Sequence, residues 1–221
     1  MPVKKQIDIS IQTVRETHRS ERQIIRQRLK EFRDVWRTGD DQLLWKELVF
    51  CIFTAGASAR MGLRSVEAIN HLLTAGTREE LLTALSGVHR YPRARSGYIE
   101  VTRKYLSSEL RMRLRDKLRS FRSPMARRDW LARERQIKGL GYKESSHFLR
   151  SIGYHGYGIL DKHILYCLQQ LGVIELAKSP VTRNHYIEIE DRMKRFADEI
   201  EINFDELDLV LWSMRAGEIL K

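Results

Sequence analysis

Residues 137–154 read I-K-G-L-G-Y-K-E-S-S-H-F-L-R-S-I-G-Y, and this segment carries the strongest structural signal in the chain. A helical pattern of apolar residues ends at Gly139-Leu140-Gly141, and a second helical pattern begins directly after it. Glycine adopts positive φ at little cost, so the chain can turn tightly between the two helices. The sequence therefore predicts a helix–hairpin–helix at about residues 126–152.

Such a hairpin exposes successive backbone N–H groups at the start of its second helix. A DNA phosphate can dock there with no side chain in the way. The carbonyl oxygens of Gly139, Leu140 and Gly141 can also hold a monovalent cation that helps to neutralise the phosphate. Gly-x-Gly is equally a common connection between helices without any ligand, so the tripeptide alone leaves both interpretations open. No other cofactor is expected, and no metal bound by side chains.

Composition narrows the class of protein. The chain has 221 residues, of which 42% are hydrophobic, so a buried core is feasible and wholesale disorder is excluded. Its two cysteines, Cys51 and Cys167, are too few for a disulfide framework, a four-thiolate zinc site or an iron–sulfur cluster. Forty Lys and Arg against 29 Asp and Glu give a net charge of +11, which favours a polyanionic partner, usually nucleic acid. A basic protein that binds no polyanion is the alternative.

Apolar residues recur at helical spacing along almost the whole chain, as in Ile25, Leu29 and Phe32. Thr77 and Glu80 have the spacing of a capping box at a helix start. Alternating patterns typical of strands are nearly absent, and the 13 Gly and 4 Pro are few for a sandwich or barrel. The sequence predicts an all-α fold with nine to eleven helices.

No apolar run approaches the roughly 20 residues that a membrane span needs. The N-terminal segment M-P-V-K-K-Q-I-D-I-S also lacks the pattern of a signal peptide. We therefore expect a soluble, cytoplasmic, nucleoid-associated protein that makes no membrane contact. A monomer is expected.

Two residues near the hairpin have the chemistry of a catalytic pair. Lys143 opens the second helix, where the positive end of the helix dipole favours the neutral, nucleophilic amine. Asp161 precedes an apolar helical run and is predicted to be its N-cap, where backbone donors favour the ionised carboxylate. Either residue alone is also explained as a surface lysine or an ordinary capping aspartate.

The segment 137–154, followed by I-L-D-K-H-I-L at 159–165, resembles the helix–hairpin–helix DNA glycosylase superfamily. Within it, the chain is most similar to the type-2 8-oxoguanine DNA glycosylase/AP lyases of archaea and some bacteria. Three further segments agree with this resemblance, which spans most of the chain: W-K-E-L-V-F-C-I-F-T-A at 45–55, G-V-H-R-Y at 87–91, and E-L-D-L-V-L-W-S-M-R-A-G-E-I-L-K at 206–221.

The resemblance implies an enzyme that excises 8-oxoguanine from double-stranded DNA and nicks the abasic strand by β-elimination. By the same resemblance Lys143 is the nucleophile that forms a Schiff base, and Asp161 is the catalytic carboxylate. Lys221, Trp212 and Tyr91 match the positions that recognise the extruded base. Core packing remains the alternative explanation for the two aromatic residues, and a frayed chain end for Lys221.

The resemblance also implies two helical subdomains with a cleft for DNA and the extruded base between them. One subdomain is expected to comprise residues 1–47 and 165–221, because Trp212 and Lys221 must reach the same cleft. The other is expected at 48–164 and contains the hairpin.

One position departs from the family pattern. By the resemblance we expect an asparagine after the Thr-Ala pair in several relatives, where this chain has Gly56. The departure leaves the preferred base opposite the lesion open, without affecting the expected chemistry.

Three alternatives to this function stay open. An enzyme of the same superfamily that acts on another oxidised base is the nearest, although relatives of the endonuclease III type commonly carry a four-cysteine cluster that this chain lacks. A non-catalytic helix–hairpin–helix module would not need both Lys143 and Asp161. A basic helical protein-interaction domain would show no salt-dependent DNA binding.

Overall fold

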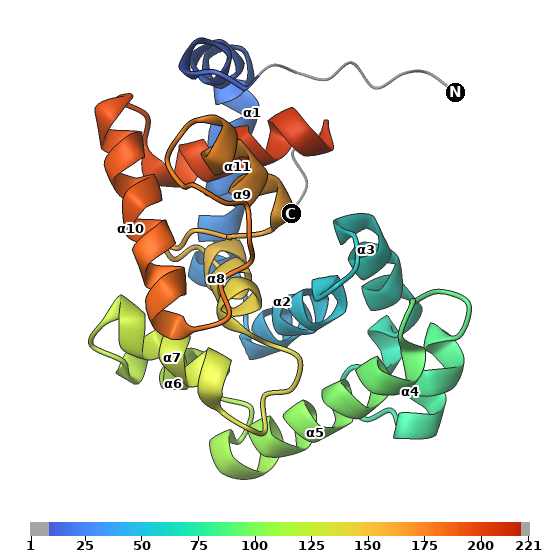
Figure 1. Cartoon of the computed structure of the whole chain (residues 1–221). Helices are drawn as coiled ribbons and strands as arrows, with labels where there is room; N and C mark the ends of the chain where they lie inside the picture. Colours follow the sequence, from blue (N-terminus) through green and yellow to red (C-terminus); the bar gives the residue numbers. More distant parts are fainter. Residues whose placement is uncertain (1–8, 218–221) are drawn as a thin grey trace. The chain divides into compact units, whose positions relative to one another are not determined.

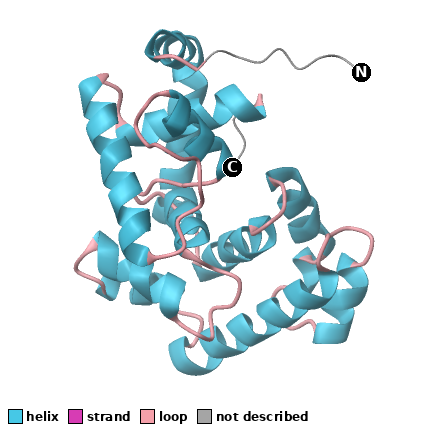
Figure 2. Cartoon of the chain, in the orientation of Figure 1, coloured by secondary structure: helices cyan, strands magenta, loops and turns pink. Residues whose placement is uncertain are grey.

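The computed structural model describes residues 9–217 (Figure 1). This part of the chain contains eleven α-helices, one short 3-10 helix and no strand (Figure 2). The predicted all-α fold and number of helices are therefore confirmed. Within the same residues, no helix is both long enough and apolar enough to cross a membrane. Lys221 lies outside the described residues.

The chain divides into two compact units. The central unit is Arg33–Gly153, and the terminal unit combines the residues up to Phe32 with those from Tyr154 onward. The boundaries lie after Phe32 and after Gly153, whereas the sequence led us to expect them after residues 47 and 164. The expected boundary at 47 would cut the helix α2 (Asp41–Thr54), whose contacts lie with helices of the central unit.

The helix α1 (Ile11–Thr38) begins in the terminal unit and ends in the central one. The other helices of the central unit are, in chain order, α2 (Asp41–Thr54), α3 (Ala59–Ala68), the 3-10 helix η1 (Asn70–Leu72), α4 (Arg78–Leu85), α5 (Pro92–Leu110), α6 (Leu114–Ser120), α7 (Pro124–Arg133) and α8 (Tyr142–Ser151). Those of the terminal unit are α9 (Lys162–Gln170), α10 (Arg183–Glu199) and α11 (Phe204–Ala216).

Helix α2 is the core of the central unit, where it packs against α3, α5, α6 and α8. Asp40 begins it as the N-cap and accepts a hydrogen bond from Leu43 N at 2.8 Å. The approach of α3 is close, because a Cβ on Gly62 would lie 2.8 Å from Thr54 Cγ2 and 3.0 Å from Phe50 Cε2. Only glycine fits at this contact without moving its neighbours.

The capping box that the sequence predicts at the start of α4 is present. Thr77 N donates to Glu80 Oε2 at 2.7 Å, and Glu80 N donates to Thr77 Oγ1 at 3.2 Å. The hydrogen bonds from Thr77 lower the pKa of the Glu80 carboxyl group below its ordinary value. This reciprocal pair therefore fixes where α4 begins.

In the terminal unit α11 packs against α9 and α10, and polar side chains tie it to α1. Glu206 accepts hydrogen bonds from His18 Nε2 at 2.6 Å and from Arg26 Nε at 2.8 Å. Ser213 Oγ donates to Glu21 Oε2 at 2.6 Å. Burial acts to raise the pKa of Glu206, but the bonds from His18 and Arg26 outweigh it and lower that pKa below its ordinary value.

Both cysteines are buried within their units. Cys51 lies in α2 and Cys167 in α9, and neither forms a disulfide. Burial raises the pKa of the Cys167 thiol to about 12, against a smaller opposite effect of Arg215. Its thiol hydrogen points to the carbonyl oxygen of Leu211, with sulfur and oxygen 3.5 Å apart.

The lowered pKa of Glu206 makes the terminal unit sensitive to acid. A carboxyl group with a lowered folded-state pKa stabilises the fold above its unfolded pKa of about 4.5, and this stabilisation is lost as the pH falls through the folded value. We expect Glu206→Gln to lower stability at pH 7 by about 1–3 kcal/mol. The variant should then lose less stability than the wild type between pH 5 and 3, as measured by thermal melting at each pH. Equal losses would show that Glu206 does not carry this acid sensitivity.

Candidate active site

The predicted hairpin is formed by α7, α8 and the turn between them. Gly139 lies at φ +81°, in the left-handed region that favours glycine. A Cβ at Gly139 would also lie 2.8 Å from Tyr98 Cδ2, so both backbone conformation and space require glycine there. Gly141 has φ −101° and is instead the N-cap of α8. Of the two glycines, only the first uses the positive φ on which the prediction rested.

A hydrogen bond anchors the turn to α5, and two apolar side chains of the turn are buried. Lys138 N donates to Thr102 Oγ1 at 2.9 Å, and the side chains of Ile137 and Leu140 are buried. Gly141, the next residue toward α8, is exposed. The hairpin thus presents its backbone at the start of α8 while its apolar side chains hold it to the central unit.

Lys143 is the second residue of α8 and forms an ion pair that the sequence analysis missed. Its Nζ lies 2.8 Å from Glu144 Oε1. The other oxygen of Glu144 accepts a hydrogen bond from Gly141 N at 3.3 Å, which completes a capping interaction at the helix start. Glu144 therefore both accepts the N–H of the N-cap residue and pairs with the predicted nucleophile. Its position three residues after the N-cap was the signal available in the sequence.

Tyr91 lies directly before α5 in the central unit and is 39% exposed. Its N–H donates to His89 Nδ1 at 2.9 Å, and His89 Nε2 lies 3.0 Å from the carbonyl oxygen of Phe53. Nδ1 accepts, so His89 is neutral here with its proton on Nε2. Burial lowers the pKa of His89, and nearby Arg95 adds to this effect while the bond to Phe53 opposes it. The neutral imidazole holds the backbone of Tyr91 in place.

Gly56 faces this aromatic residue. It lies at φ +72°, and a Cβ there would be 3.9 Å from Tyr91 Cε2. Asparagine tolerates the left-handed region better than most residues. The conformation therefore accounts for glycine at position 56 and is also one that asparagine would tolerate.

Asp161 belongs to the terminal unit, where it is the N-cap of α9 as predicted. Its Oδ1 accepts hydrogen bonds from His163 N at 2.8 Å and Ile164 N at 2.9 Å. Both capping bonds use the same carboxylate oxygen. The local role assigned to Asp161 from the sequence is therefore confirmed, and its catalytic role stays a prediction.

Three buried carboxylates of α10 and α11 hold the loop that leads to Asp161. Each accepts a hydrogen bond from a backbone N–H of the loop: Asp205 Oδ1 from Gly156 at 3.0 Å, Glu190 Oε1 from Gly158 at 2.8 Å, and Asp208 Oδ1 from Ile159 at 2.9 Å. Tyr186 adds a fourth contact, because its hydroxyl donates to the Gly158 carbonyl at 2.7 Å. Sequence reasoning missed this set, although an aspartate inside the apolar run L-D-L-V-L at 207–211 was a usable signal.

The remaining predicted residue of the terminal unit is Trp212 on α11. It is partly exposed, while Leu211 and Ser213 on either side of it are buried. This exposure is compatible with contact to a ligand. The proposed role of Trp212 in base recognition stays a prediction, as does that of Lys221.

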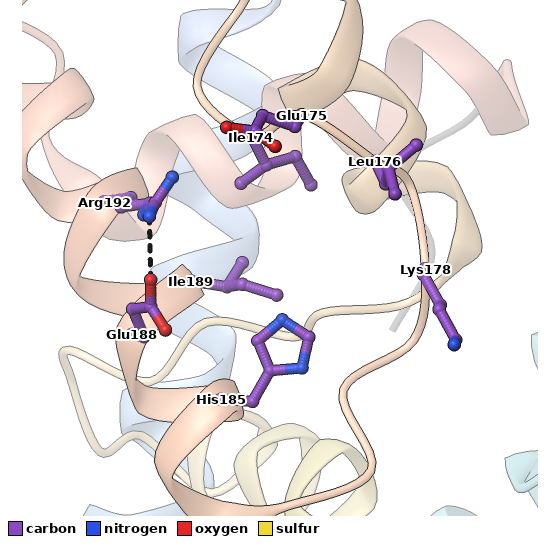
Figure 3. A pocket seen from close by; sticks show the side chains of 8 residues that line it. All are labelled: Ile174, Glu175, Leu176, Lys178, His185, Glu188, Ile189 and Arg192. Atoms are coloured by element: carbon purple, nitrogen blue, oxygen red, sulfur yellow. Dashed lines mark hydrogen bonds and ion pairs between the residues drawn. The ribbon is translucent and has the colours of Figure 1, made fainter.

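A pocket of about 240 Å³ lies in the terminal unit along α10 and the loop after α9 (Figure 3). Ile174, Leu176 and Ile189 contribute apolar surface, and the Glu188–Arg192 ion pair at 2.7 Å lies on its wall. None of the predicted site residues that the structure describes lines this pocket. Residues 9–217 also contain no group of three or more His, Cys, Asp or Glu side chains able to hold a metal ion.

Comparison with known proteins shows the family to which the chain belongs. A family model described as 8-oxoguanine DNA glycosylase matches residues 25–202. The 8-oxoguanine DNA glycosylase/AP lyase of Korarchaeum cryptofilum is 41% identical over 201 residues, which cover 90% of this chain and 91% of that protein.

Two solved structures are also similar. The 8-oxoguanine glycosylase/lyase of Methanocaldococcus jannaschii, in complex with a 15mer DNA containing 8-oxoguanine, has a TM-score of 0.86 and 35% identity, covering 96% of this chain and 99% of that one. The 8-oxoguanine DNA glycosylase of Thermotoga maritima has a TM-score of 0.85 and 30% identity, covering 96% and 98%. The chain belongs to the 8-oxoguanine DNA glycosylase family.

The carboxylates around the loop before Asp161 allow a test of what holds it. Asp208→Ala leaves the buried N–H of Ile159 without this acceptor, and we expect a loss of about 1–3 kcal/mol in the free energy of unfolding. Asp208→Asn keeps an oxygen acceptor and should lose clearly less. Urea denaturation of both variants measures the difference. Equal destabilisation would mean that the carboxylate charge, rather than the acceptor, is what matters.

Proposed function

We propose that this protein excises 8-oxoguanine from double-stranded DNA and then cleaves the abasic strand by β-elimination. The observation that carries the proposal is a lysine at the second position of α8, directly behind a glycine hairpin, in a chain of the 8-oxoguanine DNA glycosylase family. The Methanocaldococcus jannaschii relative, crystallised with DNA containing 8-oxoguanine, supports the choice of substrate.

DNA binding begins with the phosphate backbone. The N–H groups at the start of α8 receive a phosphate, and the carbonyl oxygens of Gly139, Leu140 and Gly141 are the proposed ligands of a monovalent cation. A net charge of +11 supplies attraction that weakens as salt is added, because bound phosphates release counterions.

The oxidised base is then extruded from the duplex, which costs a few kcal/mol. Tyr91 and Trp212 are the proposed stacking partners, each worth roughly 1–3 kcal/mol. The lesion differs from guanine by an 8-oxo group and a proton on N7, so few polar contacts can distinguish them. Lys221 is the proposed source of such contacts.

The chemical step needs a neutral amine at position 143. The ammonium of Lys143 lies in an ion pair with Glu144, whose carboxylate is the proposed acceptor of its proton. The amine nitrogen then bonds to C1′ of the sugar as the bond from C1′ to the base breaks, and the departing base takes up a proton. Asp161 stabilises the positive charge that develops on the sugar.

A proton then moves from the nitrogen to O4′ as the C1′–O4′ bond breaks, which opens the sugar ring and leaves a protonated Schiff base between Lys143 and C1′. This Schiff base leads to strand cleavage. Loss of a C2′ proton forms a C1′–C2′ enamine, and the bond from C3′ to its phosphate oxygen breaks with that oxygen leaving as phosphate. Hydrolysis of the imine releases Lys143. Base release and the nick thus use one nucleophile.

Replacement of the lysine tests the covalent mechanism. Lys143→Gln removes the primary amine, so borohydride should no longer trap an adduct between the protein and a duplex containing 8-oxoguanine. Lys104→Gln, which changes an exposed lysine of α5, is the matched control and should trap as the wild type does. An adduct that persists in Lys143→Gln would assign the nucleophile elsewhere. Failure of the wild type to cleave the duplex would favour a non-catalytic DNA-binding module.

Asp161→Asn separates the catalytic role of this carboxylate from its capping role. Asparagine is as good an N-cap as aspartate, so the thermal stability of the fold should change little. Loss of the negative charge should slow base excision by about 10²–10⁴-fold while damaged DNA is still bound. Excision kinetics, melting temperature and a binding isotherm measure the three effects. A variant that binds poorly or melts early would indicate a purely structural aspartate.

A further inference from the structure

Arg95 lies in the first turn of α5 and is only 7% exposed, which is unusual for a charged side chain. Its Nη2 donates a hydrogen bond to the carbonyl oxygen of Ala55, at the end of α2. The guanidinium thereby fixes the turn that follows α2 and contains Gly56. All these residues belong to the central unit.

The same guanidinium contacts two aromatic rings. Its Cζ lies 5.8 Å from the centroid of the Tyr91 ring and 5.3 Å from that of Tyr98. A planar guanidinium stacks on aromatic faces in a way that an ammonium cannot reproduce. Arg95 is therefore a neighbour of the ring that we propose as a platform for the extruded base.

Arg95 also packs against the hairpin. A Cβ on Gly139 would lie 3.3 Å from Arg95 Nη1 and 2.8 Å from Tyr98 Cδ2. The tip of the hairpin thus rests on the stack of Arg95 and Tyr98. One side chain joins the hairpin, the turn after α2 and Tyr91.

Stability alone does not account for this placement. Burial lowers the pKa of Arg95, while Tyr98, Glu144 and Tyr91 act in the opposite direction. Among the described residues, no hydrogen-bond acceptor contacts its buried Nε. A buried N–H without an acceptor is unfavourable for folding. A smaller apolar residue at position 95 would avoid this cost, so a contribution to stability does not explain the arginine.

We propose that Arg95 is a positioning residue that holds Tyr91 in the orientation needed to receive the extruded base. Its packing against the hairpin at Gly139 keeps the guanidinium in place. The inference rests on the proposed function and deepens it. It separates the two chemical steps, because base excision needs the platform, whereas β-elimination at a preformed abasic site has no base to stack.

The test compares both steps in variants of the full-length protein. Arg95→Met keeps much of the bulk of the side chain but removes the planar guanidinium and its charge. We expect it to slow single-turnover excision of 8-oxoguanine by about 10–100-fold, as for the loss of one stacking platform. Cleavage of a duplex with a preformed abasic site should change less than about threefold. Arg95→Lys keeps the charge without the planar fork and should resemble Arg95→Met.

Arg103→Met is the matched structural control. Arg103 is on the same helix, and it donates to the carbonyl oxygens of Leu72, at 3.0 Å, and of Gly76. Burial lowers the pKa of this guanidinium as well. Its loss should reduce thermal stability and leave the ratio of the two rates unchanged.

A double variant ties the effect to the platform. If Arg95 acts through Tyr91, Tyr91→Ala with Arg95→Met should excise no more slowly than the slower of the two single variants. Independent, multiplying effects would contradict the inference.

Several outcomes overturn it. If Arg95→Lys excises the base as fast as the wild type does, the positive charge alone accounts for the role of Arg95. If both steps slow to the same extent in the Arg95 variants, Arg95 contributes only to stability. If Arg95→Met does not fold, Arg95→Lys carries the same comparison. A wild type that cleaves abasic duplexes but leaves 8-oxoguanine in place would overturn the proposed function, and the inference with it. Wild-type excision with an unchanged rate ratio in the Arg95 variants would overturn the inference alone.

Discussion

The contact of the Gly139 backbone with the side chain of Tyr98 is the constraint on which the position of the hairpin depends. It excludes any Cβ at this point of the hairpin and so fixes the distance between the turn and α5. The position of the turn determines where α8 begins. The start of α8 in turn determines the position of Lys143, its second residue. A reactive lysine needs such rigidity, because small displacements from the productive geometry reduce rates strongly.

In the terminal unit, hydrogen bonds rather than close packing hold the residues before Asp161 in place. A loop rich in glycine leads to Asp161, and glycine gives it little stiffness of its own. Buried carboxylates on α10 and α11 supply the missing constraint by accepting backbone N–H groups. Each carboxylate also satisfies a backbone donor, which reduces the cost of burying both groups. The helix with the proposed base-stacking Trp212 thus also orders the loop before Asp161.

The sequence predicted the features that local rules govern. Helical periodicity gave the all-α fold, the glycines gave the hairpin, and capping preferences gave the role of Asp161 at α9. It did not reveal Arg95, His89 or Asp208, because their partners are distant in the sequence and only the packed structure brings them together. The boundaries between units were placed too far along the chain for the same reason, since the contacts of α2 with α8 have no local signature.

The two cysteines have a further consequence for a protein whose proposed substrate is a product of oxidation. Peroxide attacks thiolates, and a thiol with a pKa of about 12 leaves about one molecule in 10⁵ deprotonated at neutral pH. Cys51 is enclosed among the apolar side chains of α2, out of reach of solvent. Neither thiol is therefore a ready target for the oxidants that also damage guanine.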